Sequence, residues 1–446
     1  MLLVVPLTSG QSPMSATRTS PMDVVQADNR RIGHLVKRLR ELSLEKVSDP
    51  RRPSGCRWTL PQLLTATLGG MVSGCQSFAE TEEMTAELSA DAAVMLNLPR
   101  CLPDTTARSA LIRLEPDELQ QMLHRQILRA HKRKQLAPVG LPFGVVAIDG
   151  KCTATSVIDD QYAQRHHLTA KGQVVGVQGL VRTLTFCLTS SRVPVCMDAH
   201  PIHATTNEVG QFKAAFAAFD ETFRRSGLAE MVTLDAGFFC ADVATDINDR
   251  GYGYVIQLKD ERRDLRASAE RNLGHRKPAT ALTQTVDKSG DGVLVTRRIW
   301  MTPIADVPGW PHARGVIRVQ SERWENGETT SEDRYYVTNY AAAGLNPAQW
   351  LYLIRSHWKV ENNCHWTYDV VFAEDDRHWV NDPQGMIVVQ LLRRIACNLL
   401  ALFRAYTLSR SPGRRSSWPQ LLRTFMRTFA RFAIAGVAPR DGPASA

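Results

Sequence analysis

The chain has 446 residues, with 54 lysines and arginines against 45 aspartates and glutamates, so its formal net charge is +9. This length exceeds that of one ordinary domain, and a composition of 43% hydrophobic and 22% charged residues excludes a disordered polyelectrolyte and a membrane protein. No run of eighteen uncharged apolar residues is present to span a bilayer, and the start MLLVVPLTSG lacks the basic flank and cleavage site of a secretory signal. The nine cysteines form no Cys-x-x-Cys pair, which predicts free thiols in a reducing cytoplasm.

The N-terminal part divides into two predicted regions. Residues 1–54 read as a loose leader, rich in Ser, Thr, Pro and Gln, followed by a basic segment. Residues 55–138 repeat apolar residues at steps of three and four, which predicts an all-α N-terminal domain. Within it, the run Pro103-Asp104-Thr105-Thr106 is typical of a helix start. A short helix there is also compatible with a DNA-reading helix-turn-helix, although such helices more often belong to a bundle.

The next region, residues 139–259, alternates strands and helices and predicts the first part of an α/β core. Two of its short apolar runs end in an acid, Asp149 and Asp235, as expected of buried strands that present a side chain at their tips. One helix begins with the capping-box pattern Thr205-x-x-Glu208. The predicted order is strand, strand, strand, helix, strand, helix, strand, at residues 143–149, 179–188, 193–199, 205–223, 231–235, 241–250 and 252–258.

Residues 260–342 are predicted to be a β-rich insertion, because the runs VLVTRRIWM, GVIRVQSERW and DRYYVTNY are strand-like and separated by Gly, Pro and Asp. Residues 343–406 complete the core. Asn346 and Pro347 predict the start of a long helix that ends near Phe372. Glu361 is predicted to face the core, because it shares one helical face with Trp350, Ile354, His357, Cys364 and Tyr368.

A carboxylate on an inward face is unfavourable unless a cation meets it. If the sheet has the strand order of ribonuclease H, the strands ending at Asp149 and Asp235 are neighbours, and Glu361 completes a set of three carboxylates. Oxygen ligands without thiolates favour Mg²⁺ or Mn²⁺, and two such ions about 3.5–4 Å apart serve phosphodiester chemistry. Any one of these acids is more often a turn or cap residue, so the hypothesis rests on the three together.

Positive charge is concentrated near both ends of the chain. Residues 377–440 hold eleven arginines, no lysine and a single acid, Asp382. Such a surface attracts a nucleic-acid backbone, although a solvated helix face explains it equally well. In the predicted basic C-terminal tail, 407–446, the candidate DNA contacts are Arg423, Arg427 and Arg431. Six further arginines of this region, on segments that also carry Leu, Phe and Ile, are Arg393, Arg394, Arg404, Arg410, Arg414 and Arg415, and the N-terminal cluster is Arg30, Arg31, Lys37, Arg38 and Arg40.

Eight segments, taken in order, resemble a bacterial DDE-type insertion-sequence transposase of the H-repeat-associated branch. The resemblance covers most of residues 55–405 and implies a ribonuclease H-like catalytic core with a β insertion before the last acid. It also implies that Asp149, Asp235 and Glu361 are the catalytic, metal-binding triad. The segments are AIDGK (147–151), NEVGQF (207–212), LDAGF (234–238), YVIQLK (254–259), RYYVTN (334–339), IRSHWKVENNCHW (354–366), DVVFAED (369–375) and LLRRIACNLL (391–400).

The resemblance implies a DNA transposase that cleaves the ends of its element with Mg²⁺, for which Mn²⁺ substitutes, and joins them to target DNA. The implied partners are terminal inverted repeats, target DNA and a second copy of the chain on paired ends, in the cytoplasm at the bacterial nucleoid and with no membrane. The implied DNA contacts are Lys151, Lys259, Arg355, His357 and Trp358. The sequence departs from the branch after Lys259, where Asp260-Glu261-Arg262 replaces Gly-Asn-Gln.

Two alternatives stay open at this point. His357, Glu361 and His365 are four residues apart on one helix, a spacing that also suits a zinc-dependent hydrolase. A DNA-binding descendant of a transposase that has lost its chemistry would keep the basic surfaces. The presence of all three acids favours an active enzyme.

Overall fold

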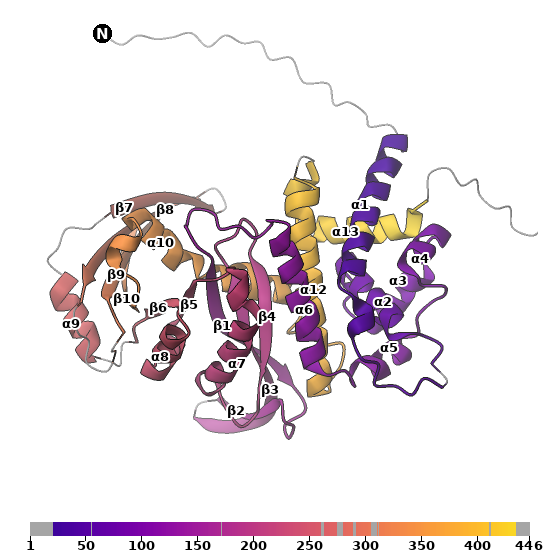
Figure 1. The fold of residues 1–446 in the computed structure, drawn as a ribbon, viewed down its shortest axis with the longest axis horizontal. Coiled ribbons are helices and arrows are strands. Elements are labelled where there is room, and N and C mark those ends of the chain that lie inside the picture. The colour runs from indigo at the N-terminus through magenta and orange to yellow at the C-terminus, as the bar shows by residue number, and fades with distance from the viewer. Residues whose placement is uncertain are drawn as a thin grey trace, which may run out of the picture.

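A ten-stranded sheet runs through the centre of the computed structural model, with helices on both of its faces and a helical part beside it (Figure 1). The structure describes residues 21–433 except 55, 171, 260–262, 274–279, 289–290, 305–309, 311 and 410–411. Several features of the sequence analysis lie outside the described residues. They are the predicted leader up to residue 20, the three residues 260–262 that depart from the H-repeat-associated branch, Arg410, and the tail beyond residue 433.

The strand order across the sheet is β2-β3-β1-β5-β6-β10-β9-β8-β7, with β4 paired to β3. Strand β1 is antiparallel to β3 and parallel to β5, which is parallel to β6. The prediction that the strands leading to Asp149 and Asp235 are adjacent in the sheet is therefore confirmed. The strands are β1 (Val145–Thr155), β2 (Ala163–Ala170), β3 (Gln173–Leu188), β4 (Val195–Ile202), β5 (Met231–Leu234), β6 (Gly253–Gln257), β7 (Thr280–Lys288), β8 (Asp291–Pro303), β9 (Gly315–Glu325) and β10 (Glu328–Thr338).

The two faces of β1 are buried against different helices, because successive side chains of a strand point to opposite faces. Val146 and Ile148 belong to a core that includes the aromatic side chains of α7 (Glu208–Phe223) and the aliphatic side chains of α8 (Ala241–Asp249). Ala147, on the other face, packs with Cys364 and the helical part. Three more elements on that second face are α10 (Pro347–Ser356), the π-helical segment η5 (Val360–His365) and α11 (Trp366–Val370).

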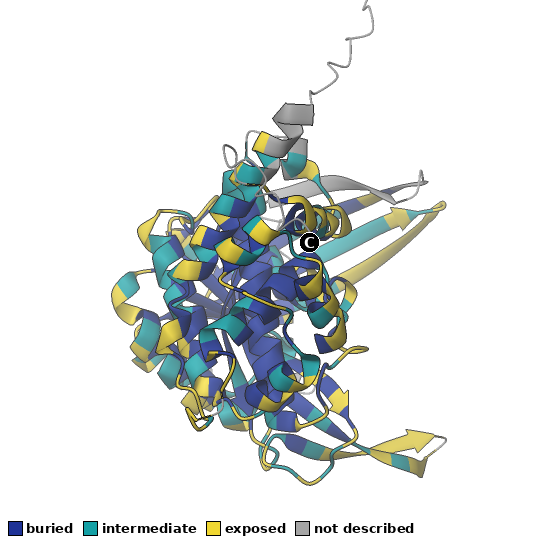
Figure 2. Cartoon of the chain, turned by 90° about the vertical axis from the view of Figure 1, so that its right-hand side faces the viewer, coloured by how far each residue is buried: buried dark blue, intermediate teal, exposed yellow. Residues whose placement is uncertain are grey.

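The predicted β insertion extends the central sheet. Strand β10 pairs antiparallel with β6, and β9, β8 and β7 follow outward, with α9 (Arg263–Leu273) beside them. The three predicted runs are β8, β9 and β10. Strands β2 and β7 were not predicted, and β3 begins earlier than expected. For β2 and β3, the reason is that the end of their hairpin projects from the molecule (Figure 2), with most of β2 and the first residues of β3 exposed, so that part has no buried alternation for a sequence pattern to reveal.

The helical part includes both ends of the described chain. Ile32, Leu35 and Leu39 of the first helix and Phe425 and Phe429 of the last are buried in one core with the intervening helices. Residues 1–54 and 407–446, expected to be a leader with a basic segment and a basic tail, thus contribute helices to this core. The helices are α1 (Pro21–Glu41), α2 (Leu60–Ser73), α3 (Phe78–Ala86), α4 (Ala90–Leu96), α5 (Asp104–Leu111), α6 (Pro116–Lys132), α12 (Pro383–Leu402) and α13 (Trp418–Arg431).

Helix starts follow from local capping chemistry. The prediction of a start at Asn346 and Pro347 is confirmed: the Asn346 side chain accepts from the Gln349 N–H and Gln349 returns the bond. The helix predicted from Thr205 instead begins at Glu208, because Asn207 is the N-cap and accepts from the Gly210 N–H at 2.9 Å.

Among the described residues, one helix has the length and hydropathy of a membrane span. It runs over Pro383–Thr407, which joins α12 to the π-helical turn η6 (Phe403–Thr407). Its most apolar window is entirely buried inside the protein, and a core helix passes the same test, so it is weak evidence for a membrane span.

Candidate active site

Asp149 and Asp235 lie side by side at one edge of the parallel strands. The register pairs Ile148 of β1 with Leu234 of β5, and each of these residues is followed directly by the acid, Asp149 or Asp235. The prediction that Asp149 ends its strand is wrong, because β1 continues to Thr155 through pairing with β3. Asp149 Oδ1 accepts from the Gly150 N–H at 2.9 Å, and Asp235 Oδ1 accepts from the Gly237 N–H at 3.0 Å.

Glu361 comes from the helix side of the site. The predicted continuous helix is interrupted: α10 ends at Ser356 and Glu361 lies in the π-helical segment Val360–His365. A π-helical turn is wider than an α-helical turn. In this segment Val360 and Cys364 are the buried residues, and Glu361 is half-buried. Glu361 therefore lies at the border of the packed face and not within it. Such π-helical turns occur frequently at functional sites.

The three carboxyl groups are coupled electrostatically. Burial raises the pKa of Asp149 to about 7, with further contributions from the charges of Asp235 and Glu361. Burial also raises the pKa of Asp235, against an opposing effect of Lys259. The pKa of Glu361 is raised by burial and by Asp235, while Arg334 opposes the shift. The site thus concentrates negative charge that its cations do not neutralise.

Glu208 is a fourth carboxylate beside the site, which the sequence analysis named only as a capping residue. Its charge raises the pKa values of both Asp149 and Asp235. A Cβ placed on Gly150 would lie 2.9 Å from its Cγ, so the absence of a side chain at Gly150 admits it. Arg182 lies near it, with Nη1 3.7 Å from Oε1. A signal existed: helices that follow parallel strands of one sheet begin near the same edge, and Glu208 is the first residue of α7.

The two histidines proposed as zinc ligands do not converge with Glu361. His357 Nδ1 lies 3.0 Å from the hydroxyl of Thr233, and burial lowers the pKa of His357 to about 4. His365 Nδ1 lies 3.5 Å from Asp149 Oδ2, and burial lowers the pKa of His365 to about 3. Both imidazoles are therefore neutral near pH 7. His357, which was expected to contact DNA, contacts Thr233 of β5 instead.

The donor set fits a hard divalent cation by its chemistry. The carboxylates of Asp149, Asp235 and Glu361 supply oxygen ligands, and their mutual repulsion would be relieved by a cation. Within the part of the chain that the structure describes, no three His, Cys, Asp or Glu side chains are gathered closely enough to hold a metal ion. The acids therefore influence one another's ionisation without forming a closed coordination shell.

The placement of Lys151 contradicts its expected role as a phosphate contact. Its side chain is only 6% exposed, and Nζ lies 2.7 Å from Asp369 Oδ1 and 3.0 Å from Asp375 Oδ1. Although burial opposes it, the charge of Glu374 and of these carboxylates raises the pKa of Lys151. Lys151 thereby connects β1, which carries Asp149, to the segment that follows Glu361.

Two arginines of the predicted basic surface are likewise internal. Arg393 and Arg394 are 1% and 0% exposed, and both pair with Glu374, which is also fully buried. The Arg394 guanidinium lies 4.4 Å from the ring centroid of Tyr368. These residues hold α12 against the segment after α11 and contribute nothing to a DNA-binding surface.

The other predicted DNA contacts reach the surface. Lys259 is exposed near Asp235, and Arg355 and Trp358 line a groove beside Glu361. On α13, three arginines four residues apart are exposed, while Leu421, Leu422, Phe425 and Phe429 are buried on the opposite side; the arginines are Arg423, Arg427 and Arg431. This arrangement fits both a DNA-binding face and a solvated helix face.

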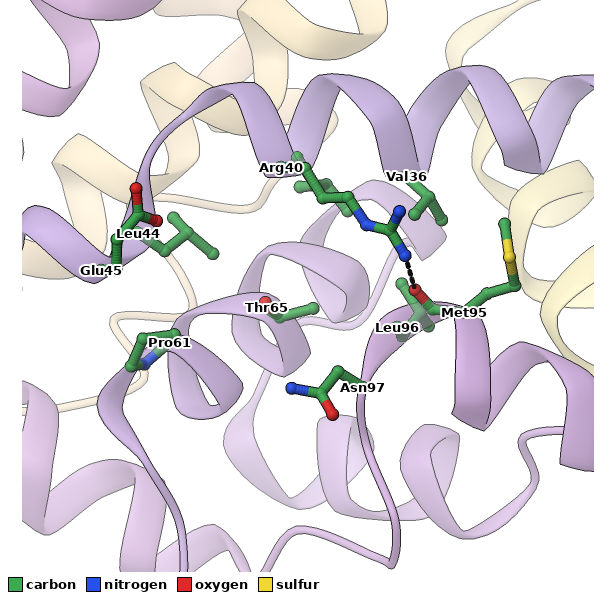
Figure 3. A pocket seen from close by; sticks show the side chains of 10 residues that line it. Val36, Arg40, Leu44, Glu45, Pro61, Thr65, Met95, Leu96 and Asn97 are labelled. Carbon is green, nitrogen blue, oxygen red and sulfur yellow. Dashed lines mark hydrogen bonds between the residues drawn. The ribbon is translucent and has the colours of Figure 1, made fainter.

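A separate cavity of about 260 Å³ lies in the helical part, where α1, α2 and α4 meet (Figure 3). Val36, Leu39 and Leu96 give it an apolar wall, and Arg40 donates across it to the Met95 carbonyl at 3.3 Å. The cavity contains none of the carboxylates of the candidate site.

The raised pKa of Asp149 predicts a pH-dependent effect on stability. In the metal-free protein, the ionised carboxylate destabilises the fold above pH 7, and this effect disappears as the pH falls toward 4. Asp149→Asn should therefore increase the free energy of unfolding at pH 8 by on the order of 3 kcal/mol, and hardly at all at pH 4. Urea titrations in EDTA at the two pH values measure the difference. Asp242→Asn, an exposed position on α8, is the matched control, and an equal effect at both pH values would contradict the prediction.

The chain is similar to known proteins over the regions that form this site. Residues 142–399 match the family described as "Transposase DDE domain", and residues 42–127 match the one described as "DDE_Tnp_1-associated". The "Uncharacterized protein in dhlA 3'region" of Xanthobacter autotrophicus is 29% identical over 25% of this chain and 39% of its own length. The "H repeat-associated putative transposase YhhI" of Escherichia coli (strain K12) is 25% identical over 38% of this chain and 47% of its own.

A third relative, the "Putative transposase YncI" of Escherichia coli O157:H7, is 21% identical over 54% of this chain and 65% of its own length. The chain thus spans roughly half the length of the curated relatives that it matches. The first family match covers more than half of the chain and includes Asp149, Asp235 and Glu361. The chain therefore belongs to the transposase DDE domain family.

Proposed function

We propose that this protein is a DNA transposase whose carboxylates Asp149, Asp235 and Glu361 carry out metal-dependent cleavage at insertion-sequence ends and strand transfer into target DNA. The observation that supports it most is the adjacency of Asp149 and Asp235 on neighbouring parallel strands, with the charge of Glu361 raising the pKa of Asp149. A gel-resolved cleavage and strand-transfer reaction with end DNA tests the proposal.

We also infer a ribonuclease H-like core, from the order and direction of the strands. The inner part of the sheet has the order β4-β3-β1-β5-β6, in which β3 is antiparallel to both β4 and β1, and β5 and β6 are parallel to β1. A site at the carboxyl edge of parallel strands is the usual position in open α/β sheets. Helices α7 and α8 pack on one face of these strands and η5 carries Glu361 on the other.

The carboxylates of Asp149, Asp235 and Glu361 would hold Mg²⁺, or Mn²⁺ in its place. The metal ions supply charge that activates an attacking water or hydroxyl and stabilises the leaving oxygen of a phosphodiester. The residues around them keep the acids available: neutral His365 lies against Asp149, and Lys151 fixes β1 to the segment after Glu361. Arg334 and Lys259 offer positive charge at the rim, where a phosphate group would approach.

A second candidate is a DNA-binding descendant without chemistry, for which the exposed arginines of α13 would suffice. The cleavage reaction separates the two candidates, because the descendant would bind end DNA and leave it uncut. In either case we infer that two copies act on paired inverted repeats in the cytoplasm, where the chain would meet nucleoid DNA.

The exposed arginines of α13 provide a test of backbone binding. Changing Arg423, Arg427 and Arg431 to Gln together should weaken binding to every DNA sequence and reduce the salt dependence, because fewer counterions are released. The slope of log K against log salt should become shallower by up to about 2.7 for three lost phosphate contacts. Fluorescence anisotropy at several salt concentrations measures the slope. Lys213→Gln on α7 is the control, and an unchanged slope in the triple variant would assign these arginines to a solvated face.

A further inference from the structure

A basic groove lies between the outer strands of the sheet and the helical segment that carries Glu361. Its volume is about 500 Å³. Strands β8, β9 and β10 form one wall, and α10 and η5 form the other. The lining includes four arginines, a single acid and one indole ring: Arg297, Arg323, Arg334, Arg355, Glu332 and Trp358.

The strand register explains why these side chains gather. Arg297 of β8 lies opposite Ser321 of β9, and Ser321 lies opposite Glu332 of β10. Two residues along β9, Arg323 lies opposite Val295. Because side chains two residues apart share a face of a sheet, the charged groups of three strands project into the same groove.

The positive charge of the groove is only partly neutralised. Arg297 has no carboxylate partner among the described residues, and its Nη1 atom is buried without a hydrogen-bond acceptor. Burial lowers the pKa of Arg297, and the neighbouring charges of Arg355 and Arg334 lower it further. At the rim, Arg323 pairs with Glu325 at 2.6 Å and Arg334 pairs with Glu332 at 2.8 Å. A buried N–H group without an acceptor among like charges is stabilised by an anion.

Trp358 gives the groove an aromatic surface. The side chain is 39% exposed, and the Arg334 guanidinium lies 5.0 Å from its ring centroid. An exposed ring beside a row of cations is the combination that binds single-stranded nucleic acid, since bases stack on the ring while phosphates contact the arginines.

The groove leads to the carboxylates of the candidate site. Trp358 and Asn362, which both line it, flank Glu361 on the helical segment. Arg334 is close enough to lower the pKa of Glu361. A strand that lies in the groove would therefore pass next to Glu361.

We propose that this groove binds an unpaired DNA strand beside the active site, with Arg297, Arg334 and Arg355 on its phosphates and Trp358 stacked against a base. This inference rests on the proposed function and specifies the form in which the DNA is held there. In a duplex the faces of the bases are covered by the neighbouring base pairs, so the ring of Trp358 would have no base face on which to stack. The indole ring therefore favours an unpaired strand over a duplex.

Binding of a labelled twelve-nucleotide single strand to the full chain, measured by anisotropy in EDTA, tests this proposal without requiring catalysis. Trp358→Ala should weaken binding by about tenfold or more, while Trp358→Phe should retain most of it, because a benzene ring still stacks. Arg297→Gln should weaken binding by a similar factor, and Arg297→Lys should recover part of it. The same strand in a duplex should lose less than about threefold with Trp358→Ala.

The matched control is Trp366→Ala, because Trp366 is also exposed but does not line the groove. Thermal melts of each variant show whether it is folded. The proposal is overturned if folded Trp358→Ala and Arg297→Gln proteins bind the single strand as the wild type does, or if single strand and duplex weaken equally. If the wild-type protein cleaves DNA but these variants bind the single strand normally, the proposal about the groove alone is rejected. Lost strand binding without cleavage by the wild type would reject the proposed chemistry alone.

Discussion

Replacing Asp149 with Asn, Asp235 with Asn or Glu361 with Gln is expected to lower the rates of DNA cleavage and strand transfer by about 10³-fold or more. Each change keeps the shape of the side chain and removes one charged oxygen ligand from the proposed metal site. The affinity for end DNA should stay within about threefold of the wild type, because the carboxylates repel phosphate and contribute no favourable contact to it. A cleavage gel and a binding titration with the same DNA measure both quantities.

The rate losses caused by these substitutions should not be additive. A double variant such as Asp149→Asn with Asp235→Asn should be scarcely slower than either single variant, because residues that act together in one step are not additive. Asp242→Asn, exposed on α8, is the control and should cut at the wild-type rate. If Glu361→Gln cuts normally in Mg²⁺, another acid is the third ligand. Asp369, with a side chain 32% exposed, is then a better candidate than Glu374, which is fully buried and paired with two arginines.

The second large effect concerns stability and arises at Glu374. Burial alone would raise the pKa of Glu374, but Arg394 and Arg393 outweigh it and hold the pKa below its ordinary value. Glu374→Gln leaves two buried guanidinium groups without a carboxylate, which should cost about 3–5 kcal/mol of unfolding free energy at pH 7. A carboxylate with a lowered pKa stabilises the fold above its unfolded pKa, and this contribution is lost as the pH falls through the folded value. The effect of the substitution should therefore shrink in acid.

Asp159→Asn is the matched control for this prediction. Asp159 pairs with Arg165 at 2.7 Å, but the two side chains are 74% and 50% exposed, so removing its charge should change stability by less than about 1 kcal/mol. Urea titrations of both variants give the comparison. Replacing Glu374 by Leu together with Arg393 and Arg394 by Met should restore much of the loss, because a buried ion network can be exchanged for apolar contacts. Equal, small losses at positions 374 and 159 would show that the buried cluster is not a stabilising network.

The sequence by itself predicted the elements whose burial follows a regular period. The apolar runs before Asp149 and Asp235 predicted two strands, which the structure has as β1 and β5, whereas their adjacency was expected only from the strand order of ribonuclease H. The Asn346 and Pro347 start of α10 and three of the four outer strands, β8, β9 and β10, were predicted from equally local signals. These predictions succeeded because side-chain alternation and capping depend on residues a few positions apart.

Only the tertiary structure decided what the charged side chains contact. Lys151 was expected to meet phosphate, but its ion-pair partner Asp375 is 224 residues further along the chain. The same holds for Arg394, which is internal although it stands in an arginine-rich segment. Periodicity indicates which face of an element is buried, but it does not identify the group that neutralises a buried charge, since that group comes from another element. The position of Glu208 near Asp149, the π-helical turn at Glu361 and the groove beside it depend on such long-range packing, so no local pattern specified them.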